Sequence, residues 1–157
     1  MTDSSSFTEH RARGPVHHRG MSALAICLTL FGLFAILTGC ADVLLGPHLL
    51  VANGAALGAS VKDPWLDSQL RFLGATWAGW GVMLIWACRD LRARGQLFEI
   101  LGAVLFVAGC GRVASCFIYP GSPALLVFFA ALELAVAIIG VSLRRLLLAP
   151  ERRRAAV

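Results

Sequence analysis

The chain has 157 residues, of which 58% are hydrophobic and 15% are charged. A soluble domain is about half apolar, with about a quarter of its residues charged, so this composition and a mean hydropathy of +0.75 exclude an ordinary soluble domain. The net charge of +5 does not indicate nucleic-acid binding, because the basic residues cluster beside apolar segments. We therefore expect an integral membrane protein in a lipid bilayer, with no nucleic-acid partner.

The polar residues 1–20 have too little apolar content to fold alone and are predicted to form a disordered cytoplasmic tail. The apolar segment over residues 22–41 is long enough to cross a hydrocarbon core of about 30 Å. Its end, Leu37-Thr38-Gly39-Cys40, is similar to a bacterial lipobox, in which Cys40 would be acylated and become the new N-terminus. We favour a retained helix, because a lipid anchor is redundant on a chain with three further apolar segments.

Residues 42–65 are mostly apolar but are interrupted by glycine, proline and asparagine, which makes them too broken to span a membrane. We expect them to form an outer interfacial loop that closes over the helices. The next span covers residues 66–88, and Asp67 or Ser68 caps its start. One face of this span carries small residues that let another helix approach closely: Gly74, Ala78 and Gly81.

Two further spans are predicted at residues 96–118 and 124–148, with a basic cytoplasmic tail at residues 149–157. The sequence therefore predicts an all-α fold, a four-helix transmembrane bundle over residues 21–148. Eleven of the fourteen basic residues flank the spans on one side, and basic flanks favour the cytoplasm. Both termini are thus expected in the cytoplasm. The preference for arginine over lysine is typical of a GC-rich bacterium, so we expect the bacterial inner membrane.

Five charged residues are expected in the outer half of this bundle, where a charge is costly unless it is paired or hydrated: Asp42, Asp67, Arg71, Arg112 and Glu133. Two interpretations are open. In the first, the charges form a purely structural ion-pair network that fixes the helix register. In the second, they line an outer-leaflet polar pocket that binds a small amphipathic ligand. The protein would then be a binding protein, an accessory subunit or a small transporter.

A membrane-embedded enzyme is the third interpretation, with Glu133 and an aspartate acting as acid and base on a lipid-like substrate. The sequence has no catalytic triad, no phosphate-binding glycine loop and no metal-ligand set, so we assign no catalytic residue, cofactor or metal and lean away from an enzyme. The five cysteines are interpreted as small buried hydrophobes, and the tryptophans as lipid-facing or interfacial. A second copy of the chain or another membrane protein is the expected protein partner.

Two stretches and one further residue resemble a known family. They are residues 63–72 (Asp-Pro-Trp-Leu-Asp-Ser-Gln-Leu-Arg-Phe), residues 111–115 (Gly-Arg-Val-Ala-Ser) and Glu133. The chain resembles domain-of-unknown-function family 4345, a group of small four-helix bacterial membrane proteins, over about residues 22–147. The motif of that family matches Asp67, Arg71, Arg112 and Glu133. The resemblance implies the four-helix fold and no particular activity.

Overall fold

The computed structural model describes the backbone of residues 15–154 and the side chains of residues 20–147. Every regular element within these residues is a helix, which confirms the predicted all-α class. In chain order they are α1 (Pro15–Leu45), α2 (Pro47–Ala52), the 3-10 helix η3 (Gly58–Lys62), α3 (Pro64–Cys88), α4 (Gly95–Ile118) and α5 (Ala124–Arg154).

The described backbone leaves out residues 1–14 of the predicted N-terminal tail and residues 155–157 of the predicted C-terminal tail. Where the structure does describe these regions, the helices are longer than expected. Helix α1 begins at Pro15, inside the predicted N-terminal tail, and α5 continues to Arg154, inside the predicted C-terminal tail. The predicted outer loop contains α2 and η3 rather than irregular backbone alone.

Among the described residues, three helices are long and apolar enough to cross a membrane, which indicates a membrane protein: Gly20–Leu45 in α1, Gly95–Ile118 in α4 and Ala124–Leu147 in α5. Helix α3 has 25 residues but is not among them. Asp67 and Arg71 lie in its first two turns, and its tryptophans and glycines add little hydropathy. Apolarity and length therefore support three of the four predicted spans.

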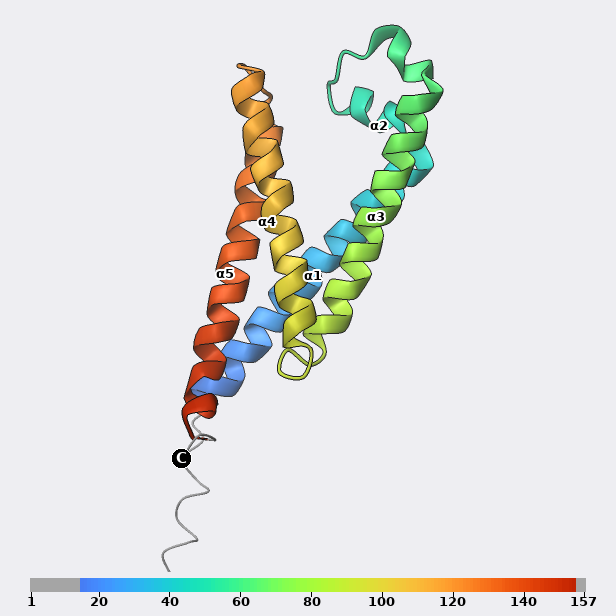
Figure 1. The fold of residues 1–157 in the computed structure, drawn as a ribbon. Coiled ribbons are helices and arrows are strands. Elements are labelled where there is room, and N and C mark those ends of the chain that lie inside the picture. The colour runs from blue at the N-terminus through green and yellow to red at the C-terminus, as the bar shows by residue number, and fades with distance from the viewer. Residues whose placement is uncertain (1–14, 155–157) are drawn as a thin grey trace, which may run out of the picture.

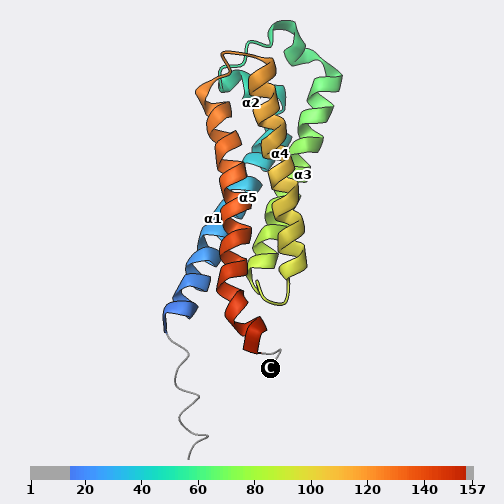
Figure 2. The ribbon, with the colours of Figure 1, turned by 60° about the vertical axis from the view of Figure 1, so that its left-hand side comes forward.

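The long helices form two antiparallel pairs, α1 with α3 and α4 with α5 (Figure 1). We call the end with the beginning of α1, the end of α5 and the loop at residues 89–94 the terminal end. The opposite end, with α2, η3 and the turn at residues 119–123, is the loop end. The pairs lie together at the terminal end and diverge toward the loop end (Figure 1). In the view of Figure 2 the axes of the four long helices are roughly aligned, and α2 lies at the loop end.

Glycines bring α1 and α3 into backbone contact. A Cβ on Gly39 would lie 2.5 Å from the carbonyl oxygen of Gly74, and a Cβ on Gly81 would lie 2.6 Å from that of Gly32. Each contact leaves no room for a larger side chain, as in other helix pairs held together by small residues. The predicted small face of this span is confirmed, and α1 is its partner.

A buried apolar core joins the two pairs in the half nearer the terminal end. Trp80 of α3 is 6% exposed, and its indole Nε1 donates a hydrogen bond to the carbonyl oxygen of Leu101, at 3.2 Å. Its ring stacks on Trp77, with 5.0 Å between ring centroids. The prediction that the tryptophans face lipid is wrong for Trp80, because the carbonyl of Leu101 satisfies its N–H inside the bundle. The other large core residues are Leu28, Leu84, Leu91, Phe98, Leu101 and Leu105.

Candidate functional site

The buried face of α5 carries two charged residues. Its buried positions follow one another at steps of three and four, which places them on one stripe of the helix: Ala130, Glu133, Ala137, Gly140 and Arg144. Glu133 is 6% exposed and Arg144 is 4% exposed. Both charges therefore lie in contacts between helices, where each needs a partner.

Arg112 of α4 is the partner of Glu133. Its Nε donates to both carboxylate oxygens, at 2.9 Å and 3.0 Å. The Glu133 side chain is 7% exposed, whereas that of Arg112 is 45% exposed. The two terminal guanidinium nitrogens of Arg112 make no hydrogen bond to any residue that the structure describes. Its guanidinium carbon lies 6.0 Å from the centre of the Phe129 ring.

Asp67 and Arg71 of α3 form a separate ion pair with two hydrogen bonds. Arg71 Nε lies 2.8 Å from one carboxylate oxygen of Asp67, and one terminal nitrogen lies 2.9 Å from the other. The second terminal nitrogen of Arg71 donates to the carbonyl oxygen of Val43. That carbonyl is in the last turn of α1, where the helix leaves carbonyls without a partner. This pair therefore caps α1 and fastens its end to α3.

Gly46 lets the chain pass close over this cap. A Cβ there would lie 2.6 Å from a carboxylate oxygen of Asp67, and the backbone has a φ of +54°. Both the close approach and the positive φ favour glycine.

Asp42 is the remaining predicted site residue. It lies on the face of α1 that packs on α3, where a Cβ added to Gly74 would lie 2.6 Å from the Cβ of Asp42. Its carboxylate makes no hydrogen bond or ion pair with any of the described residues. Its neighbour across the helix contact is therefore α3, the partner of α1.

The structure thus divides the five predicted residues between the two helix pairs. Asp67 and Arg71 belong to the α1–α3 pair, and Arg112 and Glu133 belong to the α4–α5 pair. Asp42 lies on α1 and belongs to neither ion pair. The Asp67–Arg71 pair has a structural role as a helix cap, so the group with unused hydrogen-bonding capacity is Arg112 with Asp42.

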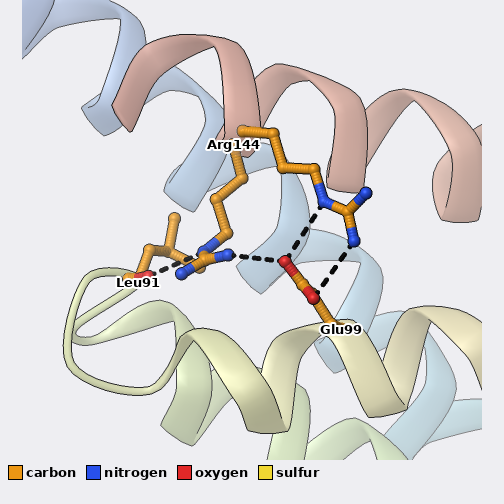
Figure 3. Close-up of polar contacts among 4 residues, drawn as sticks. Leu91, Glu99 and Arg144 are labelled. Atoms are coloured by element: carbon orange, nitrogen blue, oxygen red, sulfur yellow. Dashed lines mark hydrogen bonds and ion pairs between the residues drawn. The ribbon is translucent and has the colours of Figure 1, made fainter. Parts of the chain in front are cut away.

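Sequence reasoning missed a second buried charge site, near the terminal end. Arg144 Nε donates to the carbonyl oxygen of Leu91 at 2.8 Å, and one terminal nitrogen lies 3.1 Å from Glu99 (Figure 3). Arg145 also binds Glu99, with Nε at 3.2 Å and a terminal nitrogen at 3.1 Å. Arg144 thereby ties the loop at residues 89–94 to α5. Arg144 shares a helix face with Glu133 and Ala137, and this pattern could have predicted its burial. We counted Arg144 instead among the basic residues that flank the last span.

Gly95 makes room for this arginine. A Cβ on Gly95 would lie 1.7 Å from a terminal nitrogen of Arg144. No side chain fits at the first residue of α4, so the buried position of Arg144 requires a glycine at position 95.

Among the described residues, no group of three or more His, Cys, Asp or Glu side chains is placed to hold a metal ion. All five cysteines lie in described helices and are free thiols. Cys88 is buried as predicted. The same prediction is wrong for Cys27, Cys40 and Cys110, which lie on exposed faces of α1 and α4.

Comparison with known proteins gives one match. A family model described as "Domain of unknown function (DUF4345)" matches residues 23–143. All of the charged site residues described above except Arg144 and Arg145 fall within this match. Searches of curated proteins and of solved structures found no match.

Proposed function

The chain belongs to the family described as Domain of unknown function (DUF4345), a description that names no activity, and we propose that it binds a small amphipathic ligand at Arg112. The ligand carries an anionic group that accepts hydrogen bonds from the terminal nitrogens of Arg112. Glu133 holds the Nε side of the guanidinium and so orients it. The site lies where the two helix pairs diverge, within reach of lipid.

The half-exposed side chain of Arg112 is the observation that carries this proposal. Its Nε is bound by Glu133, and its two terminal nitrogens have no hydrogen-bond partner among the described residues. A guanidinium presents a planar fork of donors that matches carboxylate, phosphate or sulfate oxygens. Such donors at membrane depth need acceptors, and an anionic headgroup supplies them.

We further propose that the protein crosses a bacterial inner membrane four times, with both termini on the cytoplasmic side. Helix α3 has 25 residues, which gives a length of about 38 Å against a hydrocarbon core of about 30 Å. It packs on α1 through glycine contacts seven residues apart along each helix. Since α1 qualifies as a span, its antiparallel partner crosses the same bilayer. The loop end then faces outward, and Arg112 lies about 10 Å inside that surface, seven residues before Tyr119.

The test is native mass spectrometry of the protein in mild detergent, with an anionic phospholipid, phosphatidylglycerol, as the probe. The wild-type protein is expected to retain the lipid, and Arg112→Gln is expected to lose it. Arg145→Gln is the matched control, because it removes an arginine paired with a glutamate in the same helix pair, at the opposite end. Equal retention by the wild type and Arg112→Gln would overturn the proposal. A thermal destabilisation of Arg112→Gln, with no lipid retained by any form, would instead assign the ion pair a structural role.

A further inference from the structure

The loop at residues 89–94 lies where the apolar helices end, at the terminal end. The candidate span of α4 begins directly after it, at Gly95, and that of α5 ends at the same end. The loop is anchored in the protein, because Leu91 is 3% exposed and its carbonyl oxygen accepts a hydrogen bond from Arg144. A fixed loop beside the end of a span lies at the level of the lipid headgroups.

Trp86, in the last turn of α3, lies next to two arginines. The guanidinium carbon of Arg94 lies 4.2 Å from the centre of a Trp86 ring, and a terminal nitrogen of Arg94 donates to the Trp86 carbonyl oxygen. Arg89 follows Trp86 by three residues and has helical backbone angles, with a φ of −64° and a ψ of −30°. Residues three apart are neighbours on a helix surface, and helical side chains lean toward the preceding turn. Both arginines therefore flank the same indole, which is 50% exposed.

These two arginines have hydrogen-bond donors to spare. Arg89 is exposed and makes no hydrogen bond or ion pair with any residue that the structure describes. Arg94 uses one terminal nitrogen, and its other guanidinium nitrogens have no hydrogen-bond partner in the described part of the chain. The carboxylate of Asp90 accepts hydrogen bonds from the backbone of Arg92 and Ala93 instead. Two guanidinium groups thus stand beside Trp86 without a bound carboxylate.

The surroundings of this pair carry an excess of positive charge. Among the side chains of residues 20–147, the terminal end has five arginines and two acidic residues, which leaves three positive charges. One of the two acids, Glu99, is shared between two of the arginines. The first turn of α4 contains no acidic residue, so the positive end of its helix dipole adds to the excess. The terminal end therefore attracts anions, and the guanidinium fork matches phosphate oxygens.

We infer that the terminal end binds a phospholipid with two phosphate groups, of the cardiolipin type, with one phosphate at Arg89 and the other at Arg94. A lipid with a single phosphate would leave one of these arginines without an acceptor. Two phosphates in one molecule bind more tightly than two separate lipids, because the second contact forms within the complex. The acyl chains lie along the exposed apolar surface of α3 one turn away from Trp86, at Val82 and Met83. This site shares no residue with the Arg112 site.

The experiment titrates cardiolipin and phosphatidylglycerol with the same acyl chains in native mass spectrometry. It uses Arg112→Gln protein, so that lipid held at Arg112 does not contribute. This protein is expected to bind cardiolipin about tenfold more tightly than phosphatidylglycerol. Adding Arg89→Gln or Arg94→Gln is expected to lower the cardiolipin affinity about tenfold, the size of one charge-assisted hydrogen bond. Adding Arg145→Gln, the matched control, is expected to leave it unchanged, because this exposed arginine at the same end is already paired with Glu99.

Three results would overturn the inference. Equal affinity for the two lipids would show that the second phosphate contributes nothing. Equal losses in the Arg89→Gln and Arg145→Gln proteins would show a general positive field instead of a site. Displacement of cardiolipin by inorganic pyrophosphate at equal concentration would show that the acyl chains contribute nothing. Arg89→Gln breaks no contact with the described residues, so unfolding does not account for its loss of lipid.

The inference and the proposed function are tested separately. The proposed function fails if phosphatidylglycerol is retained equally with and without Arg112, whatever cardiolipin does at the terminal end. The effects of Arg89→Gln and Arg145→Gln on cardiolipin binding are measured with Arg112 intact as well. They are expected to be the same in both proteins, because the two sites lie at opposite ends of the helices.

Discussion

Gly39 of α1 and Gly74 of α3 are in backbone contact across the first helix pair, so closely that a Cβ on Gly74 would lie 2.7 Å from the carbonyl oxygen of Gly39. Gly79, on the same helix as Gly74, has no atom within 4 Å of the position its Cβ would take. The two glycines of α3 therefore differ in what a side chain would meet, although both are embedded in the same apolar segment.

We expect Gly74→Leu to destabilise the protein by about 1–3 kcal/mol or more, the usual cost of overpacking, because the new side chain must push α1 away. Gly79→Leu, the matched control, is expected to change stability by less than about 0.5 kcal/mol. Thermal unfolding in detergent, followed by circular dichroism, measures both. Equal effects of the two substitutions would contradict the close contact of α1 and α3.

Arg144 and Arg145 give a second matched pair, since both bind Glu99. The Arg144 side chain is 5% exposed and that of Arg145 is 65% exposed. Arg144→Gln is expected to cost about 1–3 kcal/mol, because it leaves the buried Leu91 carbonyl and part of Glu99 without their donor. Arg145→Gln is expected to cost less than about 1 kcal/mol, as for a surface pair. Chemical unfolding would distinguish them, and comparable losses would contradict the buried position of Arg144.

We expect the stability of the protein to depend on pH through Asp90, in the loop at residues 89–94. Its carboxylate accepts backbone hydrogen bonds from Ala93 and Arg92, at 3.0 Å and 3.1 Å. The bond from Ala93, then that from Arg92 and the positive charges of Arg94 and Arg92, hold the pKa of Asp90 below its ordinary value of 3.8. A carboxylate with a lowered folded-state pKa contributes stability above its unfolded pKa and loses it as the pH falls through the folded-state pKa.

The expected result is that the melting temperature of the wild type falls more steeply than that of Asp90→Asn between about pH 5 and about pH 2. Above about pH 5 the two curves should run parallel, because Asp90 is then ionised in both the folded and the unfolded state. Parallel curves over the whole range would show that the loop does not depend on the ionised carboxylate.

The four-span topology predicts which loops face the cell exterior. In a variant without native cysteines, Ser60→Cys in η3 is expected to react with a membrane-impermeant maleimide in intact cells. Ala93→Cys, in the loop between α3 and α4, is expected to react only after lysis. Both positions are exposed in the structure, so accessibility alone does not separate them. Labelling of both cysteines in intact cells would mean that α3 does not cross the membrane.

The sequence was informative where apolar length and small residues decide the structure. It predicted helices close to the observed α1, α3, α4 and α5, because apolar segments of this length form helices in a bilayer. The small face of Gly74 and Gly81 correctly indicated a close helix contact, although not which helix makes it. The start of α1 at Pro15 was missed, because the polar residues before Met21 give no apolar signal.

The candidate site could be predicted only in part, because pairing depends on how the helices are arranged. A helix period assigns Glu133 and Arg144 to one face, yet it does not say that Arg112 meets the first and Leu91 the second. Trp80 shows the same limit. Its burial depends on the carbonyl of Leu101 lying opposite its N–H, which only the contact between α3 and α4 determines.

The glycine contacts of α1 with α3 recur every seven residues, at Gly32 and Gly39 on one helix and at Gly74 and Gly81 on the other. Seven residues are close to two helical turns, so both contacts lie on one face of each helix and hold the two helices together over about 10 Å. We therefore expect any change in the separation of the two helix pairs at the loop end to be a rotation of one pair against the other about the apolar core, a hinge motion in which neither pair has to unwind.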